Sequence, residues 1–246
     1  MTAPGCLDPA SCQVPDPSDV DLRRLRLARL PQGFVFHTAY RRARWPALFN
    51  INPTATGNAR FSPLVIEGTN VPTLYGAATQ TVALLETCFH GVHELATRLV
   101  SEPVDLAPRG LVALSSPASL PLIDLTDAGL ERLGLTRRQL VATTPEHYAC
   151  TQQWALTLHR RRIGGVQPAG LLWHSRIAEL AQADSLLLGD LLTVASEVFV
   201  LFGDRVVTDG DAWLPGDPHY DDLTAGDGRL LAEQIAEQLG AVIATV

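Results

Sequence analysis

Residues 198–202 (VFVLF) form the apolar run that most constrains the fold of this chain. Such a run is expected of a central strand, which other elements of the protein cover. Amphipathic helices are predicted over residues 146–162 and 229–239, with shorter strands around them. The sequence therefore predicts a mixed α/β fold in which helices flank a central sheet.

Further strands are predicted where apolar residues are bounded by proline, glycine or asparagine. These segments are residues 33–38, 59–61, 72–76, 122–125 and 170–176. Helices are predicted from residue 79, after which no proline follows before Pro103, and over residues 128–135. We assign no chemistry to residues 101–121.

The chain has 246 residues, of which 46% are hydrophobic and 18% are charged, a balance typical of a globular protein. No polar linker divides its middle, so a single domain is expected over residues 31–246. Residues 1–30 are expected to form a flexible leader that ends in a short surface helix within residues 21–30. The leader lacks the basic start and the apolar core of a signal peptide.

All 19 basic residues are arginines, because the sequence contains no lysine. A guanidinium is a planar, permanently charged fork that suits phosphate or carboxylate groups. The absence of lysine excludes a lysine nucleophile or a Schiff base. The net charge of -7 argues against direct nucleic-acid binding, which needs clustered cations. No stretch reaches the roughly 20 apolar residues that span a bilayer, so no membrane partner is expected.

No metal ion is expected from the spacing of the metal-ligating residues. The four cysteines are scattered, with none in a two-residue metal knuckle: Cys6, Cys12, Cys88 and Cys150. His90 and His93 are three apart on a predicted helix, but no further residue at ligand spacing joins them. These patterns predict a reduced, cytoplasmic protein without structural zinc.

Three residues from neighbouring segments are the first candidates for a functional site. Arg60 lies in a strand-like run, where it needs an anionic partner, either a ligand or a core carboxylate. Tyr75 could stack on a heterocyclic ring or fill the core with its hydroxyl bonded. Glu86 falls at the edge of an apolar helical stripe, so it faces either a cleft rim or solvent.

A second group of polar residues stands at the ends of predicted strands. Ser175 follows an apolar strand but lacks the Gly-x-Ser-x-Gly elbow of a serine hydrolase, so we interpret it as a hydrogen-bond donor. Arg176 is a candidate beside it, with His37, Arg41 and His174 as further candidates. A glycosidase with paired carboxylates is disfavoured, since no second acid lies in a matching context.

Five blocks, in this order, resemble the RES-domain family, which is named for an arginine, a glutamate and a serine. The blocks are residues 58–63 (NARFSP), 73–76 (TLYG), 83–90 (ALLETCFH), 170–176 (GLLWHSR) and 201–205 (LFGDR). The resemblance covers residues 33–207. It implies a fold similar to ADP-ribosyltransferase domains, with a mixed sheet and a cleft for NAD.

The resemblance also implies roles for individual residues. Arg60 and Glu86 are the expected catalytic pair: Arg60 should hold the phosphates of NAD, and Glu86 should stabilise the ribosyl cation. Tyr75 should pack near the nicotinamide riboside, and Ser175 should hydrogen-bond the cofactor.

One position departs from the family pattern. The first arginine of the family normally follows an aromatic residue in the opening strand, and this chain has His37 there. Arg41 or Arg42 could replace it from the following turn. If neither does, weak phosphate binding would leave a slow hydrolase or an inactive relative.

A second departure is the long stretch over residues 177–196, to which we assign no role.

The activity implied by the resemblance is that of a toxin that degrades NAD. The expected reaction is phosphorolysis, in which inorganic phosphate is the co-substrate and nicotinamide and ADP-ribose 1″-phosphate are the products. An ADP-ribosyltransferase and an NAD glycohydrolase stay open as alternatives, as does a catalytically degenerate nucleotide-binding protein. The usual partner in the family is an Xre-type helix-turn-helix antitoxin. A homo-oligomer also stays open.

Overall fold

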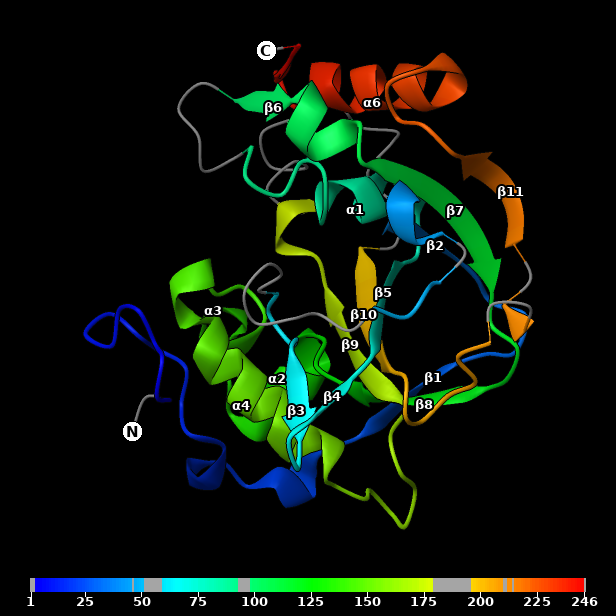
Figure 1. The fold of residues 1–246 in the computed structure, drawn as a ribbon. Coiled ribbons are helices and arrows are strands. Elements are labelled where there is room, and N and C mark those ends of the chain that lie inside the picture. The colour runs from blue at the N-terminus through cyan, green and yellow to red at the C-terminus, as the bar shows by residue number, and fades with distance from the viewer. Residues whose placement is uncertain are drawn as a thin grey trace.

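A large mixed sheet organises the molecule. The computed structural model describes residues 3–45, 47–50, 59–92, 98–178, 196–209, 212–213 and 215–245 (Figure 1). The sheet has eight strands in the order β1-β8-β9-β10-β5-β2-β7-β11. In chain order their bounds are Leu27–Leu30 (β1), Val35–Arg41 (β2), Thr73–Ala77 (β5), Arg109–Ser115 (β7), Leu120–Asp124 (β8), Gly170–His174 (β9), Glu197–Phe202 (β10) and Pro215–Tyr220 (β11).

Strand directions and the surrounding helices confirm the predicted mixed α/β fold. β8 and β9 run parallel, whereas the other neighbouring strands are antiparallel. The α-helices are Gln80–Leu85 (α1), Asp127–Leu133 (α2), Arg137–Leu140 (α3), Tyr148–His159 (α4) and Gly226–Gln238 (α6). Within the described residues, no helix is both long enough and apolar enough to cross a membrane.

Smaller elements complete the fold. Two strand pairs lie outside the large sheet: Leu64–Ile66 (β3) with Thr69–Val71 (β4), and Leu99–Ser101 (β6) with Val242–Ala244 (β12). The short helical turns are Pro17–Asp19 (η1), Leu22–Arg24 (η2), Arg42–Arg44 (η3), Glu102–Leu106 (η4) and Pro145–His147 (η5). Asn58, His93 and most of the long stretch over residues 177–196 lie outside the described residues.

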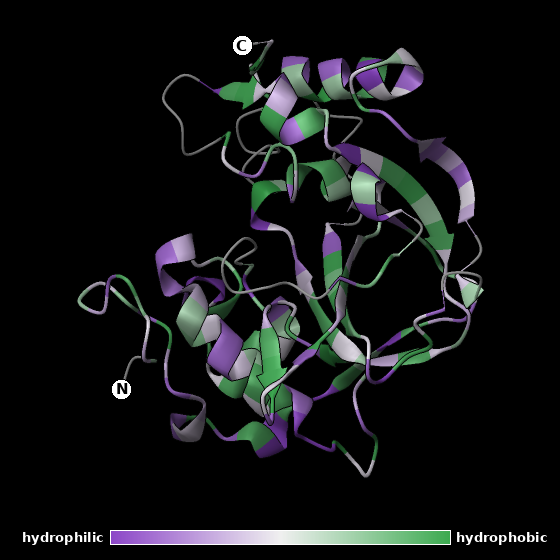
Figure 2. Cartoon of the chain, in the orientation of Figure 1, coloured by the Kyte–Doolittle hydropathy of each residue, from purple (hydrophilic) through white to green (hydrophobic). Residues whose placement is uncertain are grey.

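Strand β10 lies in the middle of the sheet and is buried from Val198 to Phe202, as its apolar run predicts. Because side chains alternate along a strand, it serves two cores. Val198 and Val200 belong to the core that includes α1 and α4, and Phe199 belongs to the core on the other face. Figure 2 shows hydrophobic residues along most of the large sheet and a mostly hydrophilic β11 at its edge.

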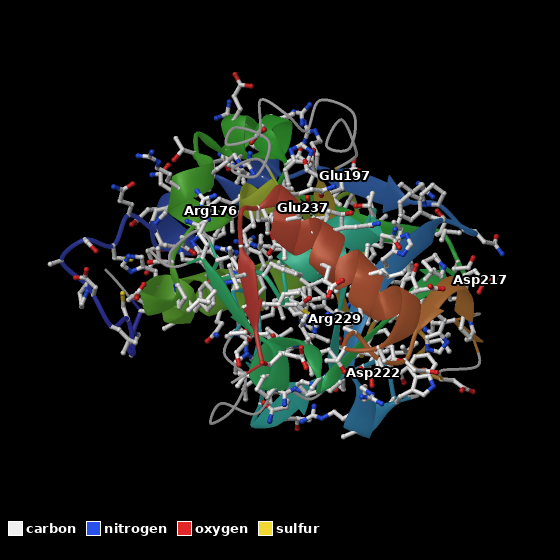
Figure 3. The ribbon with its side chains drawn as sticks, turned by 90° about the horizontal axis from the view of Figure 1, so that it is seen from above. Arg176, Glu197, Asp217, Asp222, Arg229 and Glu237 are labelled. Carbon is white, nitrogen blue, oxygen red and sulfur yellow. The ribbon has the colours of Figure 1, made fainter. Side chains whose placement is uncertain are left out.

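Helix α6 covers the core at the end of the molecule that contains α1 (Figure 1). It buries Leu231, Ala232 and Ile235 in the same core as α1. Figure 3 shows this helix from above, with Arg229 and Glu237 labelled on it. Arg229 forms an ion pair with Glu102 of η4, which holds α6 in place.

The expected short helix within residues 21–30 is wrong. Only η2 is helical there, and residues 27–30 form β1, which pairs with β8. Leucine and arginine alternate through this segment, a pattern that suits a strand at a sheet edge better than a helix. The preceding residues also pack on the protein: Leu22 and Leu25 are buried, and Trp154 Nε1 donates to the carbonyl of Pro15 at 2.7 Å. The packed structure therefore begins well before residue 31.

Two further expectations need correction near the candidate site. Residues 59–62 form a tight turn rather than a strand, since Ala59 and Ser62 bond each other through their backbones. The helix that begins after Thr79 ends at Leu85. The hydroxyl of Thr87 donates to the carbonyl of Ala83 at 2.6 Å, which competes with continuation of the helix.

Candidate active site

A cavity of 430 Å³ lies against one face of the sheet, a volume in the usual range for ligand sites. Its wall is made by residues of β2, β5 and β7, by the end of α1 and by the 59–62 turn. Five of the candidates named from the sequence line it: His37, Arg41, Arg60, Tyr75 and Glu86. Ser175, His174 and Arg176 are not among the lining residues.

The strand register places several of these residues on the same face. His37 and Arg41 are four apart on β2, so their side chains share a face, and Arg109 of β7 stands directly opposite Arg41. On the other side of β2, His37 pairs with Ala77 of β5, which puts Tyr75 on this face too. Strand pairing, together with the alternation of side chains, therefore gathers residues that lie far apart in the sequence.

Glu86 directly follows the last residue of α1, and the buried Ser175 holds its carboxylate. The helix begins at Thr79, whose hydroxyl accepts a hydrogen bond from Val82 N at 3.2 Å. At the other end, Ser175 Oγ donates to Glu86 Oε1 at 2.5 Å and accepts a hydrogen bond from Ala178 N at 3.1 Å. This arrangement fixes the direction of the carboxylate at the cavity wall.

The expected contact between Ser175 and the cofactor does not fit this geometry. Ser175 has no exposed surface, and its hydroxyl is already engaged on both sides. Ser175 follows the end of β9 and is not among the residues that line the cavity. Its contact with the site runs through Glu86.

Arg60 is buried and fixed by neutral partners. Its side chain donates to both the carbonyl and the hydroxyl of Thr143 at 2.9 Å, and its guanidinium lies 5.4 Å from the ring centre of Tyr148. Gln152 of α4 donates to the carbonyls of Ala59 and Ser62 on either side, at 3.0 Å each. Among the described residues, no carboxylate forms an ion pair with Arg60, so its charge is not neutralised within the core.

Tyr75 is half-buried and joins β5 to the 59–62 turn. Its hydroxyl accepts a hydrogen bond from Phe61 N at 3.3 Å and lies 3.2 Å from Ser62 Oγ. Burial raises the pKa of Tyr75 to about 12, so the phenol is neutral at physiological pH. Its ring meets Trp173 edge-on, with ring centroids 6.3 Å apart. The next residue, Gly76, leaves no room for a side chain, because a Cβ there would lie 2.5 Å from Phe199 Cζ.

His37 occupies the wall without a hydrogen bond to its buried Nδ1. Burial lowers the pKa of His37 below its usual value, which favours the neutral ring at pH 7. A neutral imidazole cannot supply the permanent charge of an arginine. Of the two suggested replacements, Arg41 lines the cavity, whereas Arg42 pairs with Asp222 at 2.8 Å.

Two further arginines on the cavity wall, Arg44 and Arg109, were not predicted from the sequence. Arg109 is half-buried, and its Nε is buried without a hydrogen bond to any described residue. No ion pair is found for it among the described residues. The sequence signal for Arg109 was its position at the start of the apolar, strand-like run of residues 109–115, to which no chemistry was assigned.

The charge of the cavity contrasts with that of the whole chain. Four arginines line it, Arg41, Arg44, Arg60 and Arg109, whereas Glu86 is the one carboxylate among the described lining residues. The chain itself carries a net charge of -7. Local cations in an acidic protein favour an anionic ligand in the cavity.

Comparisons with known proteins agree with this description. The sequence model of the RES domain matches residues 24–203, which is more than half of the chain. A similar solved structure is a chain of the M. tuberculosis MbcT–MbcA toxin–antitoxin complex, with a TM-score of 0.52 and 16% identity. That similarity covers 87% of this chain and 93% of the other, and at this identity it shows the fold alone. No curated protein matches.

Proposed function

Because this chain belongs to the RES-domain family, we propose that it is an enzyme that degrades NAD by breaking the nicotinamide–ribose bond. Inorganic phosphate is the proposed acceptor, which makes the reaction a phosphorolysis. A phosphate oxygen bonds to the ribose carbon as the carbon–nitrogen bond breaks. The bonding electrons return to the positively charged pyridinium, so nicotinamide leaves as a neutral molecule.

The observation that carries this proposal is one oriented carboxylate in a cavity lined by four arginines. Loss of nicotinamide leaves positive charge on the ribose ring, and a fixed carboxylate beside it is worth most in the transition state. The hydrogen bond from Ser175 holds Glu86 in one direction before substrate binds. We therefore assign Glu86 the catalytic role and Ser175 a positioning role.

The arginines supply the binding part of the proposal. Arg60 is already held by Thr143, so it can orient the pyrophosphate of NAD without reorganisation. Arg41 and Arg109 stand opposite each other on β2 and β7, where two like charges favour an anion between them. We propose that this pair binds the attacking phosphate or one phosphate of the NAD pyrophosphate. The pair would thereby take the role of the family arginine, whose position His37 occupies in this chain.

A protein antitoxin is the proposed partner. The support is the similar fold found in a toxin–antitoxin complex. An Xre-type helix-turn-helix protein that covers the cavity mouth would meet Arg41 and Arg44, both of which are exposed at the cavity wall. Co-purification with the product of a neighbouring reading frame, and loss of NAD turnover in the complex, would test this part.

The direct test is chromatography of NAD incubated with the purified chain, with and without inorganic phosphate. The proposal predicts nicotinamide release that depends on phosphate, together with a phosphorylated ADP-ribose. Free ADP-ribose formed equally well without phosphate would mean a glycohydrolase, and label transferred to a macromolecule would mean an ADP-ribosyltransferase. No nicotinamide under any condition, with NAD binding still seen in calorimetry, would identify a degenerate nucleotide-binding protein.

A further inference from the structure

Three cysteine thiols that are not among the residues lining the cavity meet at the start of α4. Cys6 and Cys12 come from the N-terminal segment and Cys150 comes from α4, and their sulfur atoms all lie within 4.8 Å of one another. None of these cysteines is in a disulfide. Figure 1 shows the N-terminal segment, in dark blue, beside α4.

Two contacts at this cluster have the length of an edge of a tetrahedral zinc site. Zinc–sulfur bonds of about 2.3 Å and zinc–nitrogen bonds of about 2.0 Å place tetrahedral ligand atoms about 3.8 Å apart for two sulfurs, and about 3.5 Å apart for a sulfur and a nitrogen. Cys12 Sγ lies 3.7 Å from Cys150 Sγ, and Cys6 Sγ lies 3.6 Å from His147 Nδ1. A disulfide would need a sulfur–sulfur distance of about 2.05 Å.

The backbone around the cluster brings the two segments together. His147 and Cys150 are three residues apart at the start of α4, so their side chains share one face of the helix. Leu7 N donates to the carbonyl of Glu146 at 2.9 Å, which joins the cysteine-bearing loop to the residue before His147. The loop therefore lies against the helix start through contacts other than those of the thiols.

We propose that Cys6, Cys12 and Cys150 bind a structural Zn²⁺ ion, with His147 as the fourth ligand. Three sulfurs and one imidazole nitrogen make a donor set typical of structural zinc sites. Binding as thiolates releases the thiol protons, and the bound ion then ties the N-terminal segment to α4. This inference is independent of the proposed reaction on NAD.

The site also has a structural connection to the cavity. Tyr148 and Thr151, on either side of Cys150, contact Arg60: the ring of Tyr148 faces its guanidinium, and Thr151 Oγ1 donates to its carbonyl. An ion that fixes the start of α4 thereby supports the helix that holds this arginine. Loss of the ion should loosen the position of Arg60 as well as the N-terminal segment.

The test is metal analysis of the full chain, purified under reducing conditions without chelator. The proposal predicts one Zn²⁺ per chain, release of that ion by a mercurial reagent that modifies thiols, and protection of three thiols from a thiol-reactive dye. Protection should disappear after prolonged exposure to a strong chelator. These measurements use the wild-type chain, so they do not depend on whether variants fold.

Variants then identify the ligands. Cys12→Ser should lose the ion, and His147→Ala should weaken zinc affinity by more than the roughly 10–100-fold that loss of an outer-shell partner costs. The matched control is Cys88→Ala, because Cys88 is buried and does not belong to the cluster. Absence of zinc from the wild-type chain would overturn the proposal, as would a mass lower by the two hydrogens of a disulfide or zinc loss equal in the Cys88 control.

Discussion

The polar side chains of the cavity wall fall into two sets, which differ in what they already contact. In the first set, Ser175 donates to the carboxylate of Glu86 at 2.5 Å, and Arg60 is held by two hydrogen bonds of 2.9 Å. In the second set, Nε of Arg109 and Nδ1 of His37 are buried without hydrogen bonds to any described residue. The first set is complete before any ligand binds, and the second is not.

This difference separates two tasks. Groups that stabilise developing charge act best when the protein fixes them in advance, because no reorganisation is then needed during the reaction. A buried polar atom without a partner costs stability, so its presence points to a ligand that completes it. We therefore expect changes at Glu86 and Ser175 to affect turnover, and changes at Arg109 to affect binding.

The largest expected effect on turnover follows removal of the negative charge of Glu86. Glu86→Gln should lower kcat for nicotinamide release by roughly 10²–10³-fold, the usual cost of losing one preorganised electrostatic group. The shape of the side chain is kept, so the melting temperature should change little. The matched control is Glu131→Gln on the exposed surface of α2. Equal rates in both variants would remove Glu86 from the mechanism.

Ser175→Ala tests whether the hydrogen bond that positions the Glu86 carboxylate matters for turnover. A hydrogen bond to a charged group contributes about 1.5–3 kcal/mol, which corresponds to roughly 10–150-fold in rate. We expect this loss in kcat with KM nearly unchanged, because Ser175 does not line the cavity. Kinetics over a range of NAD concentrations separate the two constants. A rise in KM with normal kcat would instead support a direct contact with the cofactor.

Arg109→Met tests whether an arginine whose Nε lacks a hydrogen bond to any described residue binds the anionic ligand. The change should raise KM for phosphate or NAD roughly tenfold, as expected for loss of about 1.4 kcal/mol of binding, while kcat falls less. The melting temperature should stay the same or rise, since a half-buried cation without a partner is replaced by an apolar side chain of similar length. Phosphate should stabilise the wild-type chain and the exposed Arg138→Met control more than this variant. A destabilised variant with normal KM would make Arg109 structural.

The smallest effect concerns the pH dependence of stability at His37. Its pKa is lowered by burial, so the unfolded state binds more protons than the folded state as the pH falls below about 6.5. Stability at this residue is therefore present above pH 6.5 and is lost as the pH falls through the folded pKa. Urea denaturation at about pH 7.5 and 5.5 should show a smaller loss for His37→Asn than for the wild type. His159, whose pKa is also lowered by burial, contributes equally to both chains.

Sequence patterns predicted the parts of the fold that local periodicity determines. The apolar run of β10, the strands β5, β8 and β9, and the helices α2, α4 and α6 all lie close to their predicted positions. The turn around Arg60 was wrongly predicted as a strand. Its backbone bonds to the side chain of Gln152 and between Ala59 and Ser62, and local sequence does not reveal these contacts. The short edge strand β1 forms because it pairs with β8, and the composition of residues 27–30 alone does not predict this pairing.

The candidate site divides in the same way. Three residues on the cavity wall, Arg60, Tyr75 and Glu86, could be named because they fall in ordered blocks that resemble a known family, whereas His37 and Arg41 were named from the opening strand, outside these blocks. Arg109 lies outside these blocks, and only the register of β7 on β2 places it opposite Arg41. The thiol cluster was missed for a similar reason, since Cys12 and Cys150 are 138 residues apart and their spacing matches no metal-binding motif.

The measurement that tests the account most directly is a crystal structure of the Glu86→Gln chain with bound NAD. The account predicts the nicotinamide riboside beside residue 86 and the phosphates among Arg60, Arg41 and Arg109. It also predicts that Arg109 gains the hydrogen-bond partner it lacks. NAD bound outside the cavity, or with its phosphates in contact with residue 86 and its nicotinamide riboside among the arginines, would contradict the roles assigned to Glu86 and to the arginines.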